Sequence, residues 1–277
     1  MSSAVLERPV AVSVTGLQHR LPGGRTLFDD LELRVREGES LVLLGPSGVG
    51  KSTLLRLLAG LEHPAGGDLR MGSRPTGGDG GHSYAVVFQK PLLYPWLSVR
   101  ENVALGGRFR ALRGRVDTSY VDELLEHFGI SDLADARPDQ ISGGQAQRVG
   151  VARALADEPR ILLMDEPFGA VDPLVRSGLQ QQLIDIQHEL GTTMLFVTHD
   201  MSEALRLGHE IILLAEQGRI MQQDSPTNLV EQPANAFVED FLGLNAVDKA
   251  LTTVTTEDGR TMVVDAHGRP AGFLEHT

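Results

Sequence analysis

The residues best suited to chemistry form a glycine-rich loop that fits the phosphate-binding pattern G-x-x-x-x-G-K-[ST]. The loop and the residue after it are Gly45, Pro46, Ser47, Gly48, Val49, Gly50, Lys51, Ser52 and Thr53. The glycines let backbone N–H groups surround phosphate oxygens, and the start of the following helix adds partial positive charge. Lys51 would reach the β- and γ-phosphates, and the Ser52 hydroxyl would bind Mg²⁺. The loop therefore predicts a site for a nucleoside triphosphate.

Two adjacent carboxylates, Asp165 and Glu166, follow the apolar run 161–164. A buried strand would deliver both acids to the carboxyl edge of a sheet, where ligands bind in open α/β folds. There Asp165 would hold Mg²⁺, directly or through water, and Glu166 would polarise the attacking water as general base. The alternative is a strand that ends in a solvated acidic turn, and the phosphate loop upstream argues against it.

A third candidate is the segment that begins at Ile141 and continues through Ser142, Gly143, Gly144 and Gln145. Ser142 is a favourable N-cap for the helix that follows. The two glycines let a ligand approach the backbone, and the N–H groups at a helix start can bind an anion. An ordinary helix start is the alternative interpretation.

Apolar runs and helical periodicity predict the elements that hold these residues. Strands are expected at 10–17, 27–35, 40–44, 68–71, 84–88, 161–164, 193–197 and 211–214, with helices at 51–60, 142–156 and 174–190. Such alternation is typical of a mostly parallel sheet flanked by helices, here interrupted by a helical stretch at 91–158. A glycine cluster at 77–81 lacks Lys-Ser and a following helix, so it is interpreted as a surface turn.

Composition limits the class of protein. The chain has 277 residues, 41% of them hydrophobic, which supports a packed core. Its net charge of −12 argues against nucleic acid as a partner, because nucleic-acid binders usually carry a basic surface. It has no cysteine, and no apolar run approaches the roughly 18 residues of a membrane span. The first ten residues lack the apolar core of a signal peptide, so a soluble, cytoplasmic protein is expected.

Taken together, these motifs resemble those of the ATP-binding-cassette (ABC) ATPase family, whose signature LSGGQ is matched here except for Ile141. The resemblance covers about residues 10–243 and implies ATP and Mg²⁺ as cofactors. Gln89 resembles the glutamine that senses Mg²⁺ and the attacking water, Asp172 the loop that reaches across a dimer, and His199 the histidine that contacts the γ-phosphate. The resemblance implies that the catalytic residues are Lys51, Gln89, Glu166 and His199, and that the metal ligands are Ser52, Gln89 and Asp165.

The resemblance also implies a P-loop NTPase (RecA-like) α/β core with an N-terminal antiparallel β part and an inserted helical subdomain. The core would comprise residues 1–90 and 159–232, the helical subdomain 91–158, and a C-terminal extension 233–277 with a short helix and a hairpin. Two such subunits pack head to tail, so that the phosphate loop of one faces Ser142–Gln145 of the other around two ATP molecules. One position departs from the family: Leu21 stands where an aromatic residue usually stacks on adenine, with His19 and Phe28 nearby.

A single cassette without membrane helices resembles the separate ATPase subunit of a bacterial importer. Its partners would be membrane permease subunits, a second copy or a homologous ATPase and, indirectly, a solute-binding protein, at the cytoplasmic face of the inner membrane. The segment 91–99, with the chain's only tryptophan, Trp96, would grip a permease helix; the alternative is that it packs the helical block. An exporter subunit and a DNA-repair or ribosomal ATPase are the competing functions.

Local resemblances suggest a substrate and a role for the tail. Segments 171–176, 196–200 and 233–238 resemble importers of quaternary amines such as glycine betaine or choline, whereas 94–99 resembles importers of nitrate, sulfonate or taurine. Residues 261–274 indicate two short strands around a glycine turn and resemble a fragment of paired regulatory (CBS) domains. The alternative for this tail is a simple terminal hairpin.

Overall fold

The computed structural model describes residues 8–72, 74–75, 84–108, 117–169, 171–244, 252–256, 260–264 and 269–273. The chain forms two compact units, residues 1–226 and 227–277. The glycine cluster at 77–81 lies outside the described residues. Within the described part of the chain, no helix combines the length and apolar character needed to cross a membrane.

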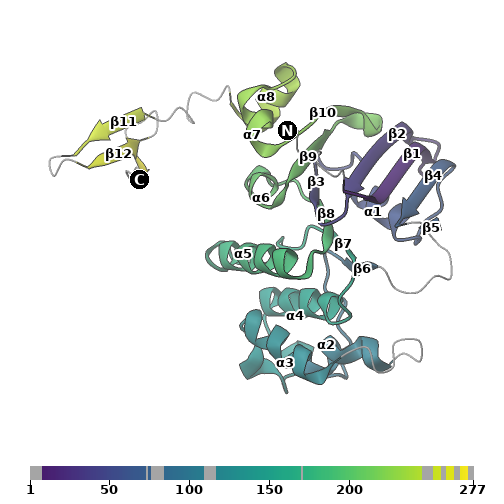
Figure 1. Cartoon of the computed structure of the whole chain (residues 1–277), viewed down its shortest axis with the longest axis vertical. Helices are drawn as coiled ribbons and strands as arrows, with labels where there is room; N and C mark the ends of the chain where they lie inside the picture. The colour runs from purple at the N-terminus through teal and green to yellow at the C-terminus, as the bar shows by residue number, and fades with distance from the viewer. Residues whose placement is uncertain are drawn as a thin grey trace, which may run out of the picture. The chain divides into compact units, whose positions relative to one another are not determined.

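The first unit is built on a six-stranded sheet of order β10-β9-β3-β8-β7-β6 (Figure 1). The strands that pair in parallel are β3 (Ser40–Leu44), β6 (Tyr84–Val87), β7 (Ile161–Asp165), β8 (Thr193–Val197) and β9 (Glu210–Leu214). At the edge, β10 (Ile220–Asp224) runs antiparallel to β9. Strands β3 and β8 are buried along their whole length, as expected for parallel strands covered on both faces. The predicted α/β class with a parallel sheet is confirmed.

A second sheet of the same unit forms the predicted antiparallel part. Its order is β2-β1-β4-β5, with β1 (Val10–Arg20), β2 (Thr26–Arg36), β4 (Gly66–Met71) and β5 (Arg74–Pro75). In β2, buried Leu31, Leu33 and Val35 alternate with more exposed residues, which is the pattern of a sheet with one face on the core. That face shares one apolar cluster with the helix α1 (Lys51–Leu58), which follows the phosphate loop.

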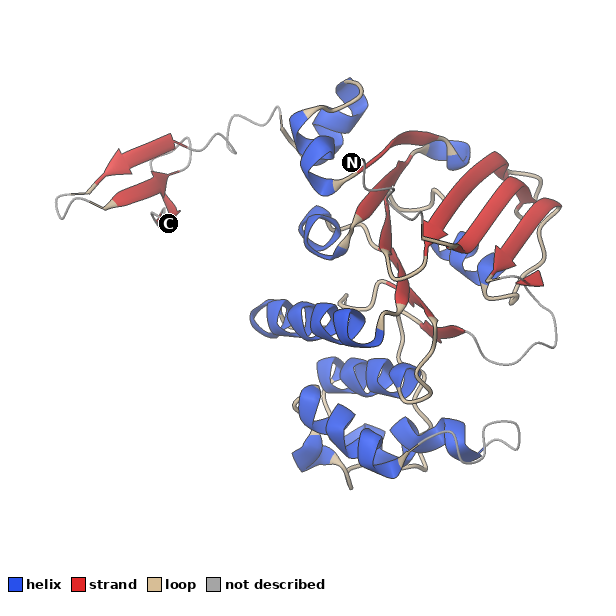
Figure 2. Cartoon of the chain, viewed as in Figure 1, coloured by secondary structure: helices blue, strands red, loops and turns tan. Residues whose placement is uncertain are grey.

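Helices interrupt the chain between β6 and β7, as predicted. They are α2 (Val99–Val103), α3 (Thr118–His127) and α4 (Gly143–Leu155), with short 3-10 turns η1 (Ala104–Arg108), η2 (Ser131–Leu133) and η3 (Pro138–Gln140). Figure 2 shows this part as helices and loops. The buried side of α3 is Val121, Leu124 and Leu125, which recur at the spacing of one helix face.

The rest of the first unit contains α5 (Pro173–Leu190), α6 (Met201–Leu207) and the turn η4 (Glu216–Gly218). The sequence indicated α5 but neither α6 nor β10. The helix α6 has only 7 residues and depends on a cap, because the Asp200 side chain accepts hydrogen bonds from Ser202 N and Glu203 N. The strand β10 carries the polar sequence IMQQD at a sheet edge, so it lacks an apolar strand pattern.

The second unit begins within α7 (Pro226–Glu231) and contains α8 (Ala236–Leu242) and a small antiparallel sheet. The sheet has β12 (Thr261–Val264) at its centre, between β11 (Thr252–Thr255) and β13 (Pro270–Phe273). The pair β12–β13 confirms the two strands expected in the tail. The strand β11 was not predicted, and its four residues are all exposed. The predicted boundary at 233 stays a prediction.

Candidate functional site

Four parallel strands bring the predicted residues to one edge of the large sheet. The phosphate loop follows β3, Gln89 follows β6, Asp165 ends β7 and His199 follows β8. These four strands are joined by parallel pairing, so their carboxyl ends lie at the same edge. In open α/β sheets, this edge is where ligands bind.

At two positions of the phosphate loop, the backbone conformation and the neighbouring atoms allow only glycine. Gly45 has φ +152°, and a Cβ there would lie 2.4 Å from the carbonyl oxygen of Leu214. Gly50 has φ +110°, and its Cβ would meet the side chains of Leu27 and Phe28 at 2.8 Å. The helix α1 then begins with neither a side-chain cap nor an acidic residue in its first turn. Its first N–H groups are therefore left for an anion.

Lys51 is folded back on the loop. Its Nζ donates hydrogen bonds to the carbonyl oxygens of Gly45, at 2.7 Å, and Pro46, at 2.9 Å. Burial lowers the pKa of Lys51, and the nearby carboxylates of Glu166 and Asp165 oppose that shift. A cation that is buried among carbonyls and carboxylates at a helix N-terminus is well placed to meet a phosphate.

Two of the predicted metal ligands lie against each other. The Ser52 hydroxyl donates a hydrogen bond of 2.8 Å to Oδ1 of Asp165, so both oxygens are within reach of one ion. Burial raises the pKa of Asp165, and the hydrogen bond from Ser52 partly opposes the shift. Mg²⁺ prefers such oxygen ligands, and it usually binds one or two protein groups together with substrate phosphates. The residues therefore fit a magnesium–nucleotide complex.

Glu166 is the meeting point of the predicted catalytic side chains. Gln89 Nε2 donates a hydrogen bond of 2.8 Å to Oε2 of Glu166, and His199 Nδ1 lies 2.9 Å from Oε1. Glu166 also has φ +45°, a left-handed conformation that is rare for residues other than glycine. Its N–H donates to the Val197 carbonyl at 2.9 Å, which fixes it against the end of β8. Backbone strain of this kind is concentrated at functional sites.

Two predicted groups lie outside this cluster. The Ser142–Gln145 segment caps α4: Ser142 Oγ accepts from Gln145 N at 3.3 Å, and Gln145 Oε1 accepts from Ser142 N at 2.8 Å. Asp172 is exposed before α5, and its carbonyl accepts from Arg176 N at 2.9 Å. These hydrogen bonds are local to the starts of α4 and α5. A role in nucleotide binding for these groups stays a prediction that needs a second chain.

The three residues near the expected adenine position differ in how far their side chains are buried. Phe28 is 1% exposed, and its ring packs beneath Gly50 and Gly218. His19 is 9% exposed and lies 3.7 Å from a Glu62 carboxylate oxygen. Both rings are therefore committed to the core, and Leu21 is the more accessible of the three.

One further residue, Arg25, was not predicted and reaches the phosphate loop from the turn between β1 and β2. Its Nη2 donates a hydrogen bond of 3.2 Å to the carbonyl oxygen of Gly48. Arginine in a surface turn carries no local signal for such a role, so only the fold reveals this contact.

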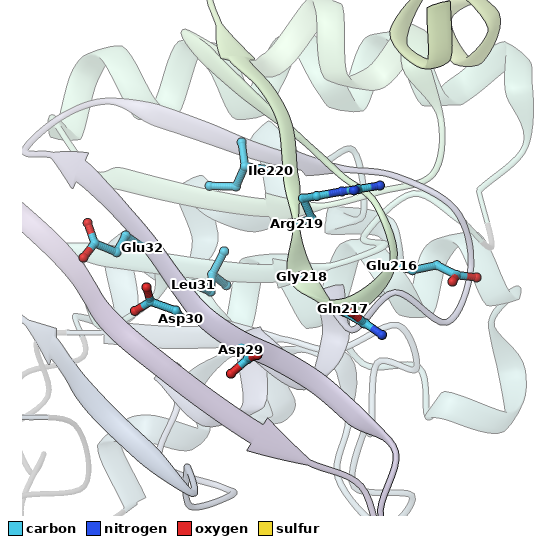
Figure 3. Close-up of a pocket in the computed structure, with 9 residues that line it drawn as sticks. All are labelled: Asp29, Asp30, Leu31, Glu32, Glu216, Gln217, Gly218, Arg219 and Ile220. Carbon is cyan, nitrogen blue, oxygen red and sulfur yellow. The ribbon is translucent and has the colours of Figure 1, made fainter. Parts of the chain in front are cut away.

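A pocket of about 550 Å³ lies elsewhere, between β2 and the η4–β10 turn (Figure 3). Its lining includes the carboxylates Asp29, Asp30, Glu32 and Glu216 and one arginine, Arg219. Four acids in one pocket would repel the phosphates of a nucleotide. The phosphate loop, and not this pocket, is therefore the candidate nucleotide site.

Comparison with known proteins gives consistent matches. A family model described as "ABC transporter" matches residues 28–169. The chain is 40% identical to the "Spermidine/putrescine import ATP-binding protein PotA" of Chromobacterium violaceum, over 89% of this chain and 68% of that protein. It is 44% identical to the "Sulfate/thiosulfate import ATP-binding protein CysA" of Bradyrhizobium diazoefficiens, over 80% of this chain and 66% of that protein.

Solved structures agree with these matches. The dimeric structure of a post-hydrolysis state of the ATP-binding cassette MJ0796, bound to ADP and Pi, has a TM-score of 0.68 and 31% identity, over 78% of this chain and 98% of that one. The structure of cbiO1 from Clostridium perfringens, part of the ABC transporter complex cbiONQ, has a TM-score of 0.70 and 27% identity, over 86% of this chain and 96% of that one.

Proposed function

The chain belongs to the ABC transporter family as an importer-type ATPase, and we propose that it works as a head-to-tail dimer around two ATP–Mg²⁺ complexes to drive a separate membrane permease. The observation that carries the chemistry is the convergence of Gln89 and His199 on the two oxygens of Glu166, beside the Ser52–Asp165 pair. In this proposal the subunit lies at the cytoplasmic face of the inner membrane, held there by the permease.

The catalytic roles follow from the atoms at this edge. Glu166 would accept the proton of the attacking water, because its carboxylate is the base that Gln89 and His199 surround. Lys51 and the free N–H groups at the start of α1 would hold the β- and γ-phosphates. Bound Mg²⁺ would neutralise charge on the phosphates, and Ser52, Asp165 and Gln89 would hold it.

Each carboxylate oxygen of Glu166 has one neighbouring side-chain contact, and each can still accept a hydrogen bond from the attacking water. His199 is the exposed partner, since 60% of its side chain is accessible. We infer that His199 turns toward the γ-phosphate when ATP binds, while Glu166 orients the attacking water.

The dimer supplies what one chain lacks. Phosphoryl transfer needs donors around the whole γ-phosphate, and the phosphate loop covers one side of it. The Ser142–Gln145 segment caps the start of α4, where Ser142 and Gly143 are exposed, and it belongs to a different part of the fold. The related cassette MJ0796 is described as a dimer with ADP and Pi bound, which supports a site shared by two chains.

The segment 91–99 is the surface proposed to contact the permease. Trp96 is 65% exposed and makes an edge-to-face contact with Tyr94 at a ring distance of 5.3 Å. Buried Asn102 holds the turn beneath them, since its amide donates to the Tyr94, Leu97 and Ser98 carbonyls and accepts from Tyr94 N. An indole this exposed does not pack the helical block, so this observation favours the docking of a permease helix.

The last part of the proposal concerns the solute that the transporter carries. Quaternary amines and the nitrate or sulfonate class stay predictions, and the two relatives described above are named for polyamines and for sulfate or thiosulfate. All the residues of the site act on ATP, so substrate choice belongs to the permease and the solute-binding protein. The names of those relatives favour import over export and over DNA-repair or ribosomal roles.

A tagged pull-down from gently solubilised membranes of the native cell tests this proposal. We expect mass spectrometry to find a permease and a solute-binding protein, and the ligand of that binding protein would then identify the substrate. A Trp96→Ala bait serves as the control, because it should recover less permease. Recovery of DNA-processing or ribosomal proteins without a permease would contradict the transport role.

A further inference from the structure

The side chain of Arg176 joins two loops of the site that are separate in the sequence. Arg176 lies in the first turn of α5, directly after the 171–172 segment. Its Nη2 donates to the Val171 carbonyl oxygen at 3.3 Å, and its Nη1 donates to Asp200 Oδ2 at 3.3 Å. The same Nη1 lies 3.7 Å from Oε1 of Glu203. One guanidinium therefore contacts both the loop before α5 and the loop that carries His199.

The loop that carries His199 is fixed on both sides of that histidine. Before it, Thr198 Oγ1 donates to Glu203 Oε2 at 2.7 Å and accepts from Asp200 N at 3.0 Å. After it, Asp200 Oδ1 accepts from Ser202 N at 2.8 Å and so caps α6. Because Arg176 contacts both acids of this network, it holds the frame from which His199 reaches Glu166.

The stability of the helix α5 alone does not explain an arginine at position 176. A cation in the first turn of a helix is disfavoured by the helix dipole. Here it is compensated by Asp200 and by Glu203, a carboxylate that is only 4% exposed. The Nε atom of Arg176 is buried and has no hydrogen-bond partner among the described residues, so the guanidinium does not form a complete fork–fork pair. Such a contact can shift when either loop moves.

We propose that Arg176 is a positioning residue that sets the place of His199 against Glu166 according to the position of the 171–172 segment. The proposal rests on the proposed function, in which that segment reaches the second subunit of the dimer. A contact made by Asp172 with the partner would then change the Val171–Arg176–Asp200 path and, through it, the place of His199. Each site would thereby respond to the closing of the dimer.

The test compares Arg176→Gln, Arg176→Lys, His199→Ala and the double variant Arg176→Gln/His199→Ala in the full chain. Arg206→Gln is the matched control, because Arg206 also bridges α6 and α5, through a 3.3 Å contact with Gln181, and within the described part of the chain it has no hydrogen bond or ion pair with Asp200 or Glu203. The readouts are the NMR signal of the His199 ring without nucleotide, identified by its loss in His199→Ala, and the kcat and ATP dissociation constant of the ATPase.

We expect Arg176→Gln to move the His199 signal and to lower kcat about 10- to 100-fold, as misplacement of a catalytic group does, while the ATP dissociation constant stays that of the wild type. The double variant should be no slower than His199→Ala, and Arg176→Lys should recover part of kcat. Arg206→Gln should match the wild type. If Arg176→Gln does not fold, the His199 signal and kcat of Arg176→Lys are compared with those of the wild type instead.

Two results would overturn the proposal: a His199 signal that does not move in the Arg176 variants, or a double variant whose loss is the product of the two single losses. A wild-type chain without ATPase activity would contradict the proposed function instead. The His199 signal, which needs no ATP, would still decide the role of Arg176.

Discussion

Among single residues, Glu166 is the proposed general base, because Gln89 and His199 both converge on its carboxylate. Glu166→Gln keeps the size of the side chain and removes the base. We expect the rate of hydrolysis to fall by about 10²- to 10⁴-fold, the usual contribution of a general base. ATP should still bind, because the phosphate loop is unchanged, and the variant should accumulate as a closed dimer. Turnover assays and size-exclusion chromatography with ATP measure both effects.

Lys51→Ala is the control for that experiment. It removes the buried cation whose Nζ lies against the Gly45 and Pro46 carbonyls, so productive nucleotide binding and the ATP-dependent dimer should both be lost. Rapid turnover by Glu166→Gln would show that another group is the base.

Residues whose type and spacing form a motif could be predicted from the sequence, and the fold brought Gln89, Glu166 and His199 together as their motifs required. Arg25 and Arg176 could not be found in this way. Their roles depend on contacts with residues that are distant in the sequence, the Gly48 carbonyl for Arg25 and Asp200 for Arg176. Arginine on a surface turn or in a first helical turn gives no such indication.

For whole elements, the depth of burial decided what the sequence could predict. The bounds of β3 and β8 were predicted residue for residue, because each is a short apolar run that is buried along its length. Several elements were missed, and three of them, α6, β10 and β11, are short, polar or exposed. Their formation depends on a cap or on pairing with a neighbour, and neither is visible in a local pattern.

The junction of β3 and β9 should make stability depend on pH. Ser40 N donates to His209 Nδ1 at 3.1 Å, and His209 N donates to the Ser40 carbonyl at 2.9 Å. Burial lowers the pKa of His209; His188 and Arg8 add to the shift and Glu39 opposes it. A lowered pKa means that the folded state disfavours the charged ring. The free energy of unfolding should therefore decrease as the pH falls below about 6.5, the pKa of an unperturbed histidine, and should stop decreasing below the folded-state pKa.

His209→Asn isolates this effect, because an asparagine Oδ1 can accept the Ser40 hydrogen bond and does not titrate. In urea unfolding at several pH values, the free energy of unfolding of the wild type should fall relative to that of the variant on acidification. A difference that is constant with pH would exclude His209 as the cause.

On the scale of the whole molecule, the first unit exposes two surfaces that we propose are contacted by other chains. Ser142 and Gly143 are exposed at the start of α4, and the 91–99 segment presents Trp96 and Leu92 at 65% and 60% exposure. The two surfaces are connected, since Arg153 of α4 donates to the Pro91 and Leu92 carbonyls at 2.6 and 3.0 Å. These hydrogen bonds join the last turn of α4 to the proposed permease surface.

Trp96→Ala tests that surface in the assembled transporter. The indole is mostly exposed, so its loss should change the free energy of unfolding by no more than about 0.5 kcal/mol, as is usual for surface positions. The isolated subunit should keep its ATPase activity, because Trp96 lies outside the Glu166 cluster. Transport by the reconstituted complex should be lost, because the aromatic contact with the permease helix is removed.

Leu61→Ala is the matched control, since Leu61 is 58% exposed and lies outside the 91–99 segment, and a complex with this variant should transport normally. If Trp96→Ala fails to fold or loses all ATPase activity, the indole supports the subunit itself; if transport is intact, the permease binds elsewhere.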